Sequence, residues 1–407
     1  MNIAPELDRR NGSVFLVNYL LIFLAAPVIY VGVTQAALCN KLGASATVAS
    51  LPASAYLLGQ AAPLFFSWLV PRRRERDVVV WANAITASLL ASVMVTLLLP
   101  LPNTVRIGVV VMQGLLQGLS ASTSLVFMTQ CLRRGTSLEG RAQTLKRTFS
   151  VGPFTAVAGS LGAQYLLSSG KLPYPYDFAV IYGLAALCCA GVAVWSSRFR
   201  LPAAAEEPHV GLVQFFATAG REFFTNRHLL LLWLCYVLWN CTLGGISNLS
   251  LFTREAIGRD PRDFSGIIMA IRFGCKAIGG YFLGLLATHA GLRASVMATV
   301  CLVGAGMLWA LLVPGYGYLF SFGLLGAGEL GGAYFPNYVA SISSIAASTR
   351  NLSIITLATP AASFAPALSG SLTDHVGFRA SFGFGILTAA FALALLTKVH
   401  PRAQDKP

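Results

Sequence analysis

Charged side chains are scarce in this chain: they make up 11% of its 407 residues, whereas 56% of the residues are hydrophobic. Soluble globular proteins carry about 25% charged residues, so a chain with so few could not cover a water-facing surface with solvated groups. The hydrocarbon core of a bilayer needs no such cover, and a helix that crosses it needs about 20 apolar residues. The composition therefore excludes a soluble globular protein and predicts a multi-pass membrane protein embedded in a lipid bilayer.

Several kinds of reactive chemistry are missing as well. The eight cysteines fall mostly inside apolar runs, and their spacing indicates neither a disulfide framework nor a metal site. There is no P-loop for a nucleotide, no glycine-rich dinucleotide turn after a strand and no cluster of histidines. We therefore expect a protein that is not an enzyme, with no cofactor and no metal.

Long apolar runs are what the sequence has instead. They are continuous and rich in Ala, Leu and Gly, unlike the short alternating segments of membrane β-barrels. The prediction is an all-α integral membrane fold of twelve transmembrane helices in two pseudo-symmetric six-helix bundles. The expected spans are 14–38, 46–70, 78–99, 105–132, 145–168, 178–197, 229–252, 264–288, 294–313, 318–344, 352–372 and 382–397.

The net charge of +14 comes from 29 basic residues against 15 acidic ones, a balance that is also common in nucleic-acid-binding proteins. With twelve spans, however, most of the basic residues fall on the side of the two termini, and such a bias sets the orientation of membrane proteins. We therefore expect the cytoplasmic (inner) membrane, both termini in the cytoplasm, and no nucleic acid. Arg147 is expected at a cytoplasmic helix end, without a role in substrate binding.

One polar stretch separates the sixth span from the seventh. The predicted division is an N-terminal bundle over residues 1–197, a cytoplasmic linker over 198–228 and a C-terminal bundle over 229–407. In the linker, apolar residues from Leu212 to Phe223 recur at helical spacing, which predicts an amphipathic helix on the membrane surface. Glycines recur between the halves at an offset of about 215 residues, as in Gly59 and Gly274, and repeated halves are common in secondary transporters.

The loop after the eighth span reads GLLATHAGLR, from Gly284 to Arg293. Together with the six-plus-six arrangement, this resembles the major facilitator superfamily, whose loop signature has the form G-x-L-A-D-R-x-G-R-R. Gly284, Gly291 and Arg293 match the signature, and the resemblance implies that this loop takes part in the conformational change. Thr288 and His289 replace the acidic and basic pair of the signature, and the loop after the second span, SWLVPRRRER, lacks the aspartate as well. A similar stretch after the eleventh span, with Asp374, is interpreted as an external turn.

Two cations lie where an apolar helix is expected to cross the middle of the membrane. Arg272 and Lys276 are four residues apart in the eighth span, so they share one face of the helix. A cation at that depth costs about 2.5 kcal/mol or more on insertion scales. The acid well inside a span is Glu329, in the tenth. Its pairing with Arg272 or with Lys276 would be a structural salt bridge, and would leave one positive charge over for an anionic group of a substrate.

Polar residues at membrane depth in other spans are further candidates for the same cavity, although each of them could instead serve as a hydrogen bond between helices. The candidates for substrate binding, besides Arg272 and Lys276, are Gln113, Gln117, Tyr236, Asn240, Tyr334, Asn337 and Tyr338.

These residues and the resemblance lead to one expectation with two alternatives. We expect a monomeric secondary active transporter that moves a small organic anion across the cytoplasmic membrane by alternating access, coupled to protons through Glu329. The first alternative is an efflux transporter for amphipathic drugs or lipids, with the charges merely structural. The second, from another class of protein, is a non-transporting membrane receptor or scaffold.

Overall fold

The computed structural model describes residues 5–70, 74–168, 172–202, 211, 220–221, 223–343, 351–352 and 354–399. Throughout these residues the secondary structure is helical, and six helical segments are long and apolar enough to cross a membrane. They are Glu75–Leu98, Asn103–Gly135, Tyr176–Ser196, Arg227–Leu251, Pro261–Leu312 and Phe378–Thr397. The protein is therefore a multi-pass membrane protein, as its composition predicts.

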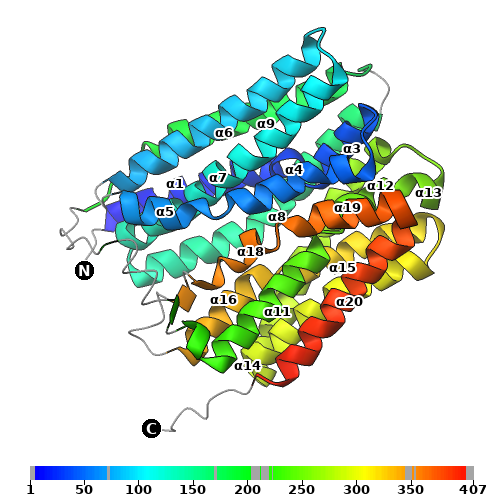
Figure 1. Ribbon diagram of the computed structural model, residues 1–407. Coiled ribbons are helices and arrows are strands. Elements are labelled where there is room, and N and C mark those ends of the chain that lie inside the picture. The colour runs from blue at the N-terminus through cyan, green and yellow to red at the C-terminus, as the bar shows by residue number, and fades with distance from the viewer. Residues whose placement is uncertain are drawn as a thin grey trace.

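The first half of the chain forms one bundle, drawn in blue to green in Figure 1. Its helices are α1 (Pro5–Leu24), α2 (Ala26–Ile29), α3 (Val33–Lys41), α4 (Ala46–Gly59), α5 (Ala62–Leu69), α6 (Glu75–Leu98), α7 (Asn103–Gly135), α8 (Leu138–Ser168) and α9 (Tyr176–Ser196). Within this bundle α6 packs on α7 and α9, and α1 packs on α8.

The second half forms the other bundle, drawn in green to red (Figure 1). Its elements are α11 (Arg227–Leu243), α12 (Ile246–Leu251), α13 (Thr253–Ile257), η2 (Pro261–Phe264), α14 (Ser265–Leu312), η3 (Gly315–Leu319), α15 (Phe320–Gly328), α16 (Gly331–Ile342), α18 (Ala358–Ala361), α19 (Phe364–Val376) and α20 (Phe378–Thr397). Within this bundle α14 packs on α15 and α20, and α11 packs on α20.

Several of the spans expected as single helices are broken, so that detail of the prediction is wrong. The first span divides into α1, α2 and α3, because Pro27 cannot continue the backbone hydrogen bonding and Gly32 adopts φ +138°. Breaks also fall at Gly244–Gly245, between α11 and α12, and at Glu329–Leu330, between α15 and α16. Each break lies at membrane depth. Irregular backbone is tolerated there where protein or a cavity surrounds it.

The eighth and ninth spans run on as one element, α14, which turns sharply at Gly291. This residue has φ +84° and ψ 166°, a conformation that is essentially restricted to glycine. The expected position of Arg147 is also wrong: α8 starts at Leu138, so Arg147 lies in its third turn rather than at an end. Most of the amphipathic helix expected in the linker lies outside the described residues, and the division of the chain at 198–228 stays a prediction.

The two bundles meet at one end of the molecule. In Figure 1, the first turn of α1 and the last turn of α20 lie on one side of the molecule, which we call the terminal end. The last turns of α3 and α12 lie on the opposite side, which we call the far end. Close to the far end, Lys41 pairs with Asp260 at 3.6 Å and Asp177 pairs with Arg262 at 3.2 Å. Gln164 of α8 accepts hydrogen bonds from the first N–H groups of α14. For the described residues, polar contacts between the bundles concentrate between the membrane centre and the far end.

Asp374 makes another of these contacts, and the sequence interpretation missed it. Its carboxylate accepts hydrogen bonds from the Ala46 and Thr47 N–H groups, both at 2.8 Å, and from the Thr47 hydroxyl at 2.5 Å. These are donors of the first turn of α4, which a negative charge stabilises. Asp374 therefore caps a helix of the opposite bundle rather than occupying an ordinary turn. Gly370, one turn earlier, allows the close approach: a Cβ there would lie 2.6 Å from the Ala46 oxygen.

Candidate functional site

Arg272, Lys276 and Glu329 form one charge cluster. Arg272 donates through Nε to Glu329 Oε1 at 2.5 Å and pairs with the same oxygen through Nη2, while Lys276 Nζ lies 3.3 Å from Glu329 Oε2. The sequence left open which cation pairs with the acid, and the structure brings both to it. The Arg272 and Glu329 side chains are each 8% exposed and that of Lys276 is 24% exposed.

Backbone packing brings Glu329 to this point. It directly follows α15 as the residue at its C-terminal cap, and α15 contains Gly326 and Gly328. A Cβ at Gly326 would lie 2.1 Å from the Arg272 carbonyl oxygen, so only a glycine lets α15 approach α14 so closely. The break after α15 then points the carboxylate across α14, toward both cations, instead of continuing the helix.

The cluster carries one positive charge more than it has negative. Tyr30 of the other bundle, at the break between α2 and α3, places its aromatic ring near both cations. Its ring centroid is 5.6 Å from Lys276 Nζ and 6.0 Å from Arg272 Cζ, within the range of cation–π contact. Tyr30 also packs edge-on against Phe273, with ring centroids 4.8 Å apart. An aromatic face stabilises a cation but does not neutralise it, so the cluster remains suited to an anion.

A cavity of about 140 Å³ lies between the bundles, beside this cluster. Arg272 and Glu329 line it from one bundle, together with Asn240. The other bundle contributes Tyr30, Val31, Gly32, Ala53, Tyr56 and Leu57, and the remaining lining residues are Leu243, Gly244, Ile246, Ser247 and Pro366.

The broken helices shape this cavity from both sides. Tyr30–Gly32 is the break in the first span, and Gly244–Gly245 is the break in the seventh. The two breaks sit at corresponding positions of the two halves, and such paired Gly/Pro interruptions are the sequence signal that indicates a binding site in transporters with internal repeats. The sequence interpretation did not name Gly32 or Gly244, the two glycines of these breaks that line the cavity, nor Ser247 and Pro366 beside them.

The other predicted substrate-binding residues divide into two sets. Gln113 and Gln117 are buried inside the N-terminal bundle: Gln113 donates to the Gln117 side chain, which donates to the Ile29 carbonyl at 2.9 Å. They thus brace the backbone directly before Tyr30, and they are not among the residues that line the cavity.

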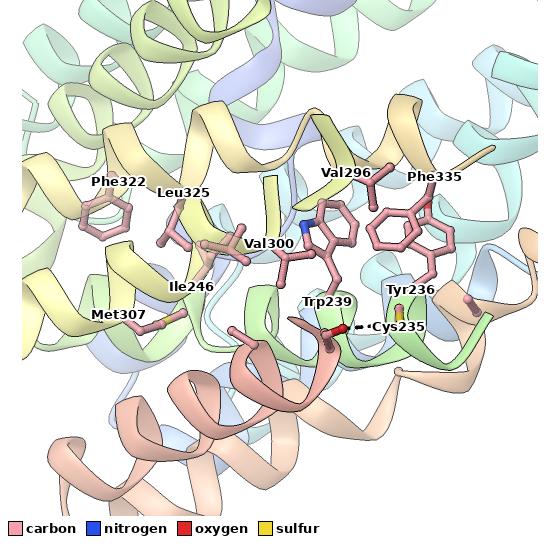
Figure 2. Close-up of a cluster of buried hydrophobic side chains, with 14 of the residues drawn as sticks. Cys235, Tyr236, Trp239, Ile246, Val296, Val300, Met307, Phe322, Leu325 and Phe335 are labelled. Carbon is pink, nitrogen blue, oxygen red and sulfur yellow. Dashed lines mark hydrogen bonds between the residues drawn. The ribbon is translucent and has the colours of Figure 1, made fainter. Parts of the chain in front are cut away.

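Tyr236 and the α16 residues lie around an aromatic cluster next to the cavity. Figure 2 shows Tyr236, Trp239 and Phe335 side by side, and the Tyr236 and Phe335 rings stack with centroids 4.7 Å apart. Tyr338 is buried, Tyr334 is half-buried and Asn337 is exposed. The indole N–H of the buried Trp239 has no hydrogen-bond partner within the part of the chain that the structure describes. This donor lies beside Gly331 of α16, where a Cβ would be 2.8 Å from it.

The residues of the loop motif lie at the terminal end. Gly291 makes the turn in α14, and Gly284 has open space where a Cβ would lie. Arg293 donates to the Leu396 and Thr397 carbonyls at 3.1 and 2.9 Å. Arg293 thus satisfies free carbonyls at the C-terminus of α20, where a cation is favoured. Its described contacts hold the C-terminal bundle together.

Comparison with known proteins identifies the fold. No protein-family model and no curated protein matches this sequence. Solved structures do match over nearly the whole chain. A point mutant of the nucleoside transporter NupG is 13% identical with a TM-score of 0.69, covering 96% of this chain and 98% of its own. A D-xylose-proton symporter is 10% identical with a TM-score of 0.71, covering 97% and 98%. The xylose transporter XylE from E. coli, in a partially occluded inward open conformation, is 11% identical with a TM-score of 0.70, covering 99% and 100%.

These similarities establish the fold, which is the one shared by these transporters and the one expected from the resemblance to the major facilitator superfamily. The fold class predicted from the apolar runs is thereby confirmed. At identities of 10–13% the similarity carries no information about the substrate.

Proposed function

We propose that this protein is a monomeric secondary active transporter that moves a small organic anion across the cytoplasmic membrane by alternating access. The membrane orientation in this proposal places the terminal end in the cytoplasm, as the distribution of basic residues favours. The fold, the cavity between the bundles and the charge beside it support the proposal together.

The surplus positive charge of the Arg272–Lys276–Glu329 cluster is the observation that carries it. One carboxylate serves two cations, so a second anionic group is needed for neutrality at membrane depth. A carboxylate or phosphate of the substrate would supply it. The planar fork of Arg272, which lines the cavity, suits such a group geometrically, while Lys276 acts as a point charge.

Glu329 is the residue that we assign to proton coupling. Both cations contact its carboxylate in the absence of substrate. A substrate anion that binds Arg272 competes with Glu329 for that cation, and we assign to Glu329 the proton that is taken up when this ion pair opens. Binding of the anion and uptake of a proton would then favour each other. The D-xylose-proton symporter shows that this fold accommodates proton coupling, with a different substrate.

The conformation described here is interpreted as one closed at the far end and accessible from the terminal end. The ion pairs and helix caps between the bundles support this, because they lie near the far end. The cavity, at about 140 Å³, is smaller than typical ligand pockets of about 300–1,000 Å³. The bundles must therefore separate further before a substrate can occupy the site.

A second candidate is export of amphipathic molecules. The aromatic and aliphatic part of the cavity wall favours it, namely Tyr30, Tyr56, Leu57, Leu243 and Ile246. In that case the charge cluster would be a structural device, and an apolar ligand would bind without engaging Arg272.

The experiment that separates these functions is ligand-induced stabilisation of the purified protein, with matched panels of organic anions, organic cations and neutral amphiphiles. The wild type is compared with Arg272→Met and Lys276→Met, and with Arg254→Met as a control, because Arg254 is an exposed arginine on α13. Anions should raise the unfolding temperature of the wild type and of the control, but not of Arg272→Met. Equal stabilisation of all four proteins by amphiphiles would reject the anion proposal in favour of export.

Uptake into proteoliposomes tests the coupling. The best stabilising anion should accumulate inside when a proton gradient is applied, and Glu329→Gln should abolish the response to the gradient. Accumulation that is equally strong in Glu329→Gln would remove Glu329 from the mechanism.

A further inference from the structure

A second cavity lies at the terminal end, away from the site between the bundles. It has a volume of about 440 Å³ and is formed by one face of α1 and one face of α8. Six of its lining residues are polar: Asp8, Arg9, Ser13, Gln143, Thr144 and Arg147. The two helices touch behind it, since a Cβ at Gly12 would lie 2.6 Å from the Thr144 hydroxyl oxygen. The proposed transport mechanism makes no use of this cavity.

The charge in this cavity is unbalanced. Arg9 and Arg147 contribute one guanidinium from each helix, and neither has an acidic partner among the described residues. The one carboxylate of the lining, Asp8, is committed elsewhere: it accepts hydrogen bonds from the Ser137 N–H at 3.2 Å and the Ser137 hydroxyl at 2.5 Å. The cavity therefore presents two available cationic forks, which suit the oxygens of a phosphate group.

The depth of the arginines matches the edge of the hydrocarbon core. The apolar part of α1 begins at Val14, five residues after Arg9, and that of α8 begins at Phe149, two residues after Arg147. At 1.5 Å per residue, both guanidinium groups can therefore reach the level at which lipid headgroups lie.

The outer face of α8 continues from this cavity into the membrane. Phe154 and Leu161 follow Arg147 at intervals of seven residues, so the three lie along one stripe of the helix. Phe154 is 72% exposed and Leu161 is 52% exposed, as expected for residues that contact acyl chains. The face of α8 toward α14 is a different one, marked by the buried residues Ala156 and Ser160.

We propose that this cavity, here the α1–α8 groove, binds an anionic phospholipid of the leaflet on the terminal side. Arg9 and Arg147 bind its phosphate, and an acyl chain lies along Phe154 and Leu161. A phosphate site continuous with an exposed apolar stripe fits a lipid better than it fits a free anion. Basic pockets between helices on the cytoplasmic side bind acidic lipid headgroups in other membrane proteins. This inference is independent of the proposed transport function.

The test uses the purified full-length protein in a neutral detergent. It is titrated with dioleoylphosphatidylglycerol, with dioleoylphosphatidylcholine and with inorganic phosphate, while the unfolding temperature is followed by tryptophan fluorescence. The wild type should be stabilised at lower concentrations of the anionic lipid than of the zwitterionic one. Arg9→Gln and Arg147→Gln should each raise the half-saturating concentration of the anionic lipid about fivefold.

Two control variants make the result specific to the groove. Arg133→Gln removes an exposed arginine of the terminal end that does not line the groove, and it should leave the titration unchanged. Phe154→Ser should weaken the effect of the anionic lipid. An equal loss in Arg133→Gln, or no preference between the two lipids, would overturn the proposal. Stabilisation by inorganic phosphate that depends on Arg147 and not on Phe154 would instead assign the groove to a free anion.

Discussion

Glu329→Gln should destabilise this protein far more than the loss of either cation that contacts it. In the wild type one carboxylate neutralises one of two cations, and the remaining charge is shared between a side chain that is 8% exposed and one that is 24% exposed. Removing one partner of a buried ion pair typically costs about 3–5 kcal/mol, because it leaves an uncompensated charge. Glu329→Gln leaves two cations on one helix face, so its cost should lie in the upper part of this range.

Loss of either cation should destabilise the protein less than Glu329→Gln does, because each of these two variants leaves one cation paired with the carboxylate. Lys276→Met keeps the Arg272–Glu329 pair, in which two nitrogens contact the same oxygen. Since Lys276 is the more exposed partner and its removal also relieves the repulsion from Arg272, the cost should be about 1 kcal/mol or less. Arg272→Met leaves the 3.3 Å contact between Lys276 and Glu329, and should fall between the other two variants.

The decisive comparison is the double variant Lys276→Met/Glu329→Gln. It has a single buried cation, so it should be more stable than Glu329→Gln alone. The effect of Lys276→Met in this background should differ from its effect in the wild type by an interaction energy of about 0.5–3 kcal/mol. The assay is the unfolding temperature in detergent, with helical content checked by circular dichroism. The reasoning about the cluster fails if Glu329→Gln is as stable as the wild type, or if the second substitution does not restore stability. Solvation by water would then be sufficient to stabilise the two cations.

Three further predictions concern the backbone and the contact between the bundles. Gly326→Ala should cost about 1–3 kcal/mol in unfolding experiments and weaken anion binding, because its Cβ would lie 2.1 Å from the Arg272 oxygen; unchanged binding would show that α15 can shift freely. Gly291→Ala should cost about 1–3 kcal/mol in the same assay, because Gly291 has φ +84°. Gly284→Ala is the control: its Cβ would enter open space, so it should change the stability by no more than about 0.5 kcal/mol. Partial burial raises the pKa of the Asp374 carboxyl, but its hydrogen bonds, chiefly from Thr47, outweigh this and leave the pKa below the ordinary value of 3.8. The Asp374 contact should therefore stabilise closure of the far end above about pH 4 and lose this effect as the pH falls through the lowered pKa. In acid, the distance between spin labels on α4 and α19 should lengthen in the wild type. It should not change with pH in Asp374→Asn.

The membrane class, the helical fold class and the presence of Arg272, Lys276 and Glu329 within apolar runs could be inferred from the sequence. These predictions need little knowledge of tertiary structure, because the cost of placing a charge or an unbonded peptide in hydrocarbon is large and local. A cation in the middle of an apolar run is conspicuous wherever the neighbouring helices lie. The breaks at Gly32 and Gly244 were also visible as glycines, but glycine is common in this chain, so its count alone does not distinguish a break from a close helix contact.

Partners across the two bundles could not be predicted, because they depend on how each helix is rotated about its axis. Depth alone places Gln113 beside the cavity, whereas the rotation of α7 turns it into the N-terminal bundle. Rotation and backbone approach also bring Glu329 to both cations, since Gly326 lets α15 touch α14 there. In the same way Asp374, which looks like an ordinary turn residue in the sequence, caps α4 of the opposite bundle, because the geometry of the α4–α19 contact brings together residues 327 positions apart. The sequence by itself determined which charges enter the membrane, and the tertiary structure alone decided which groups they meet.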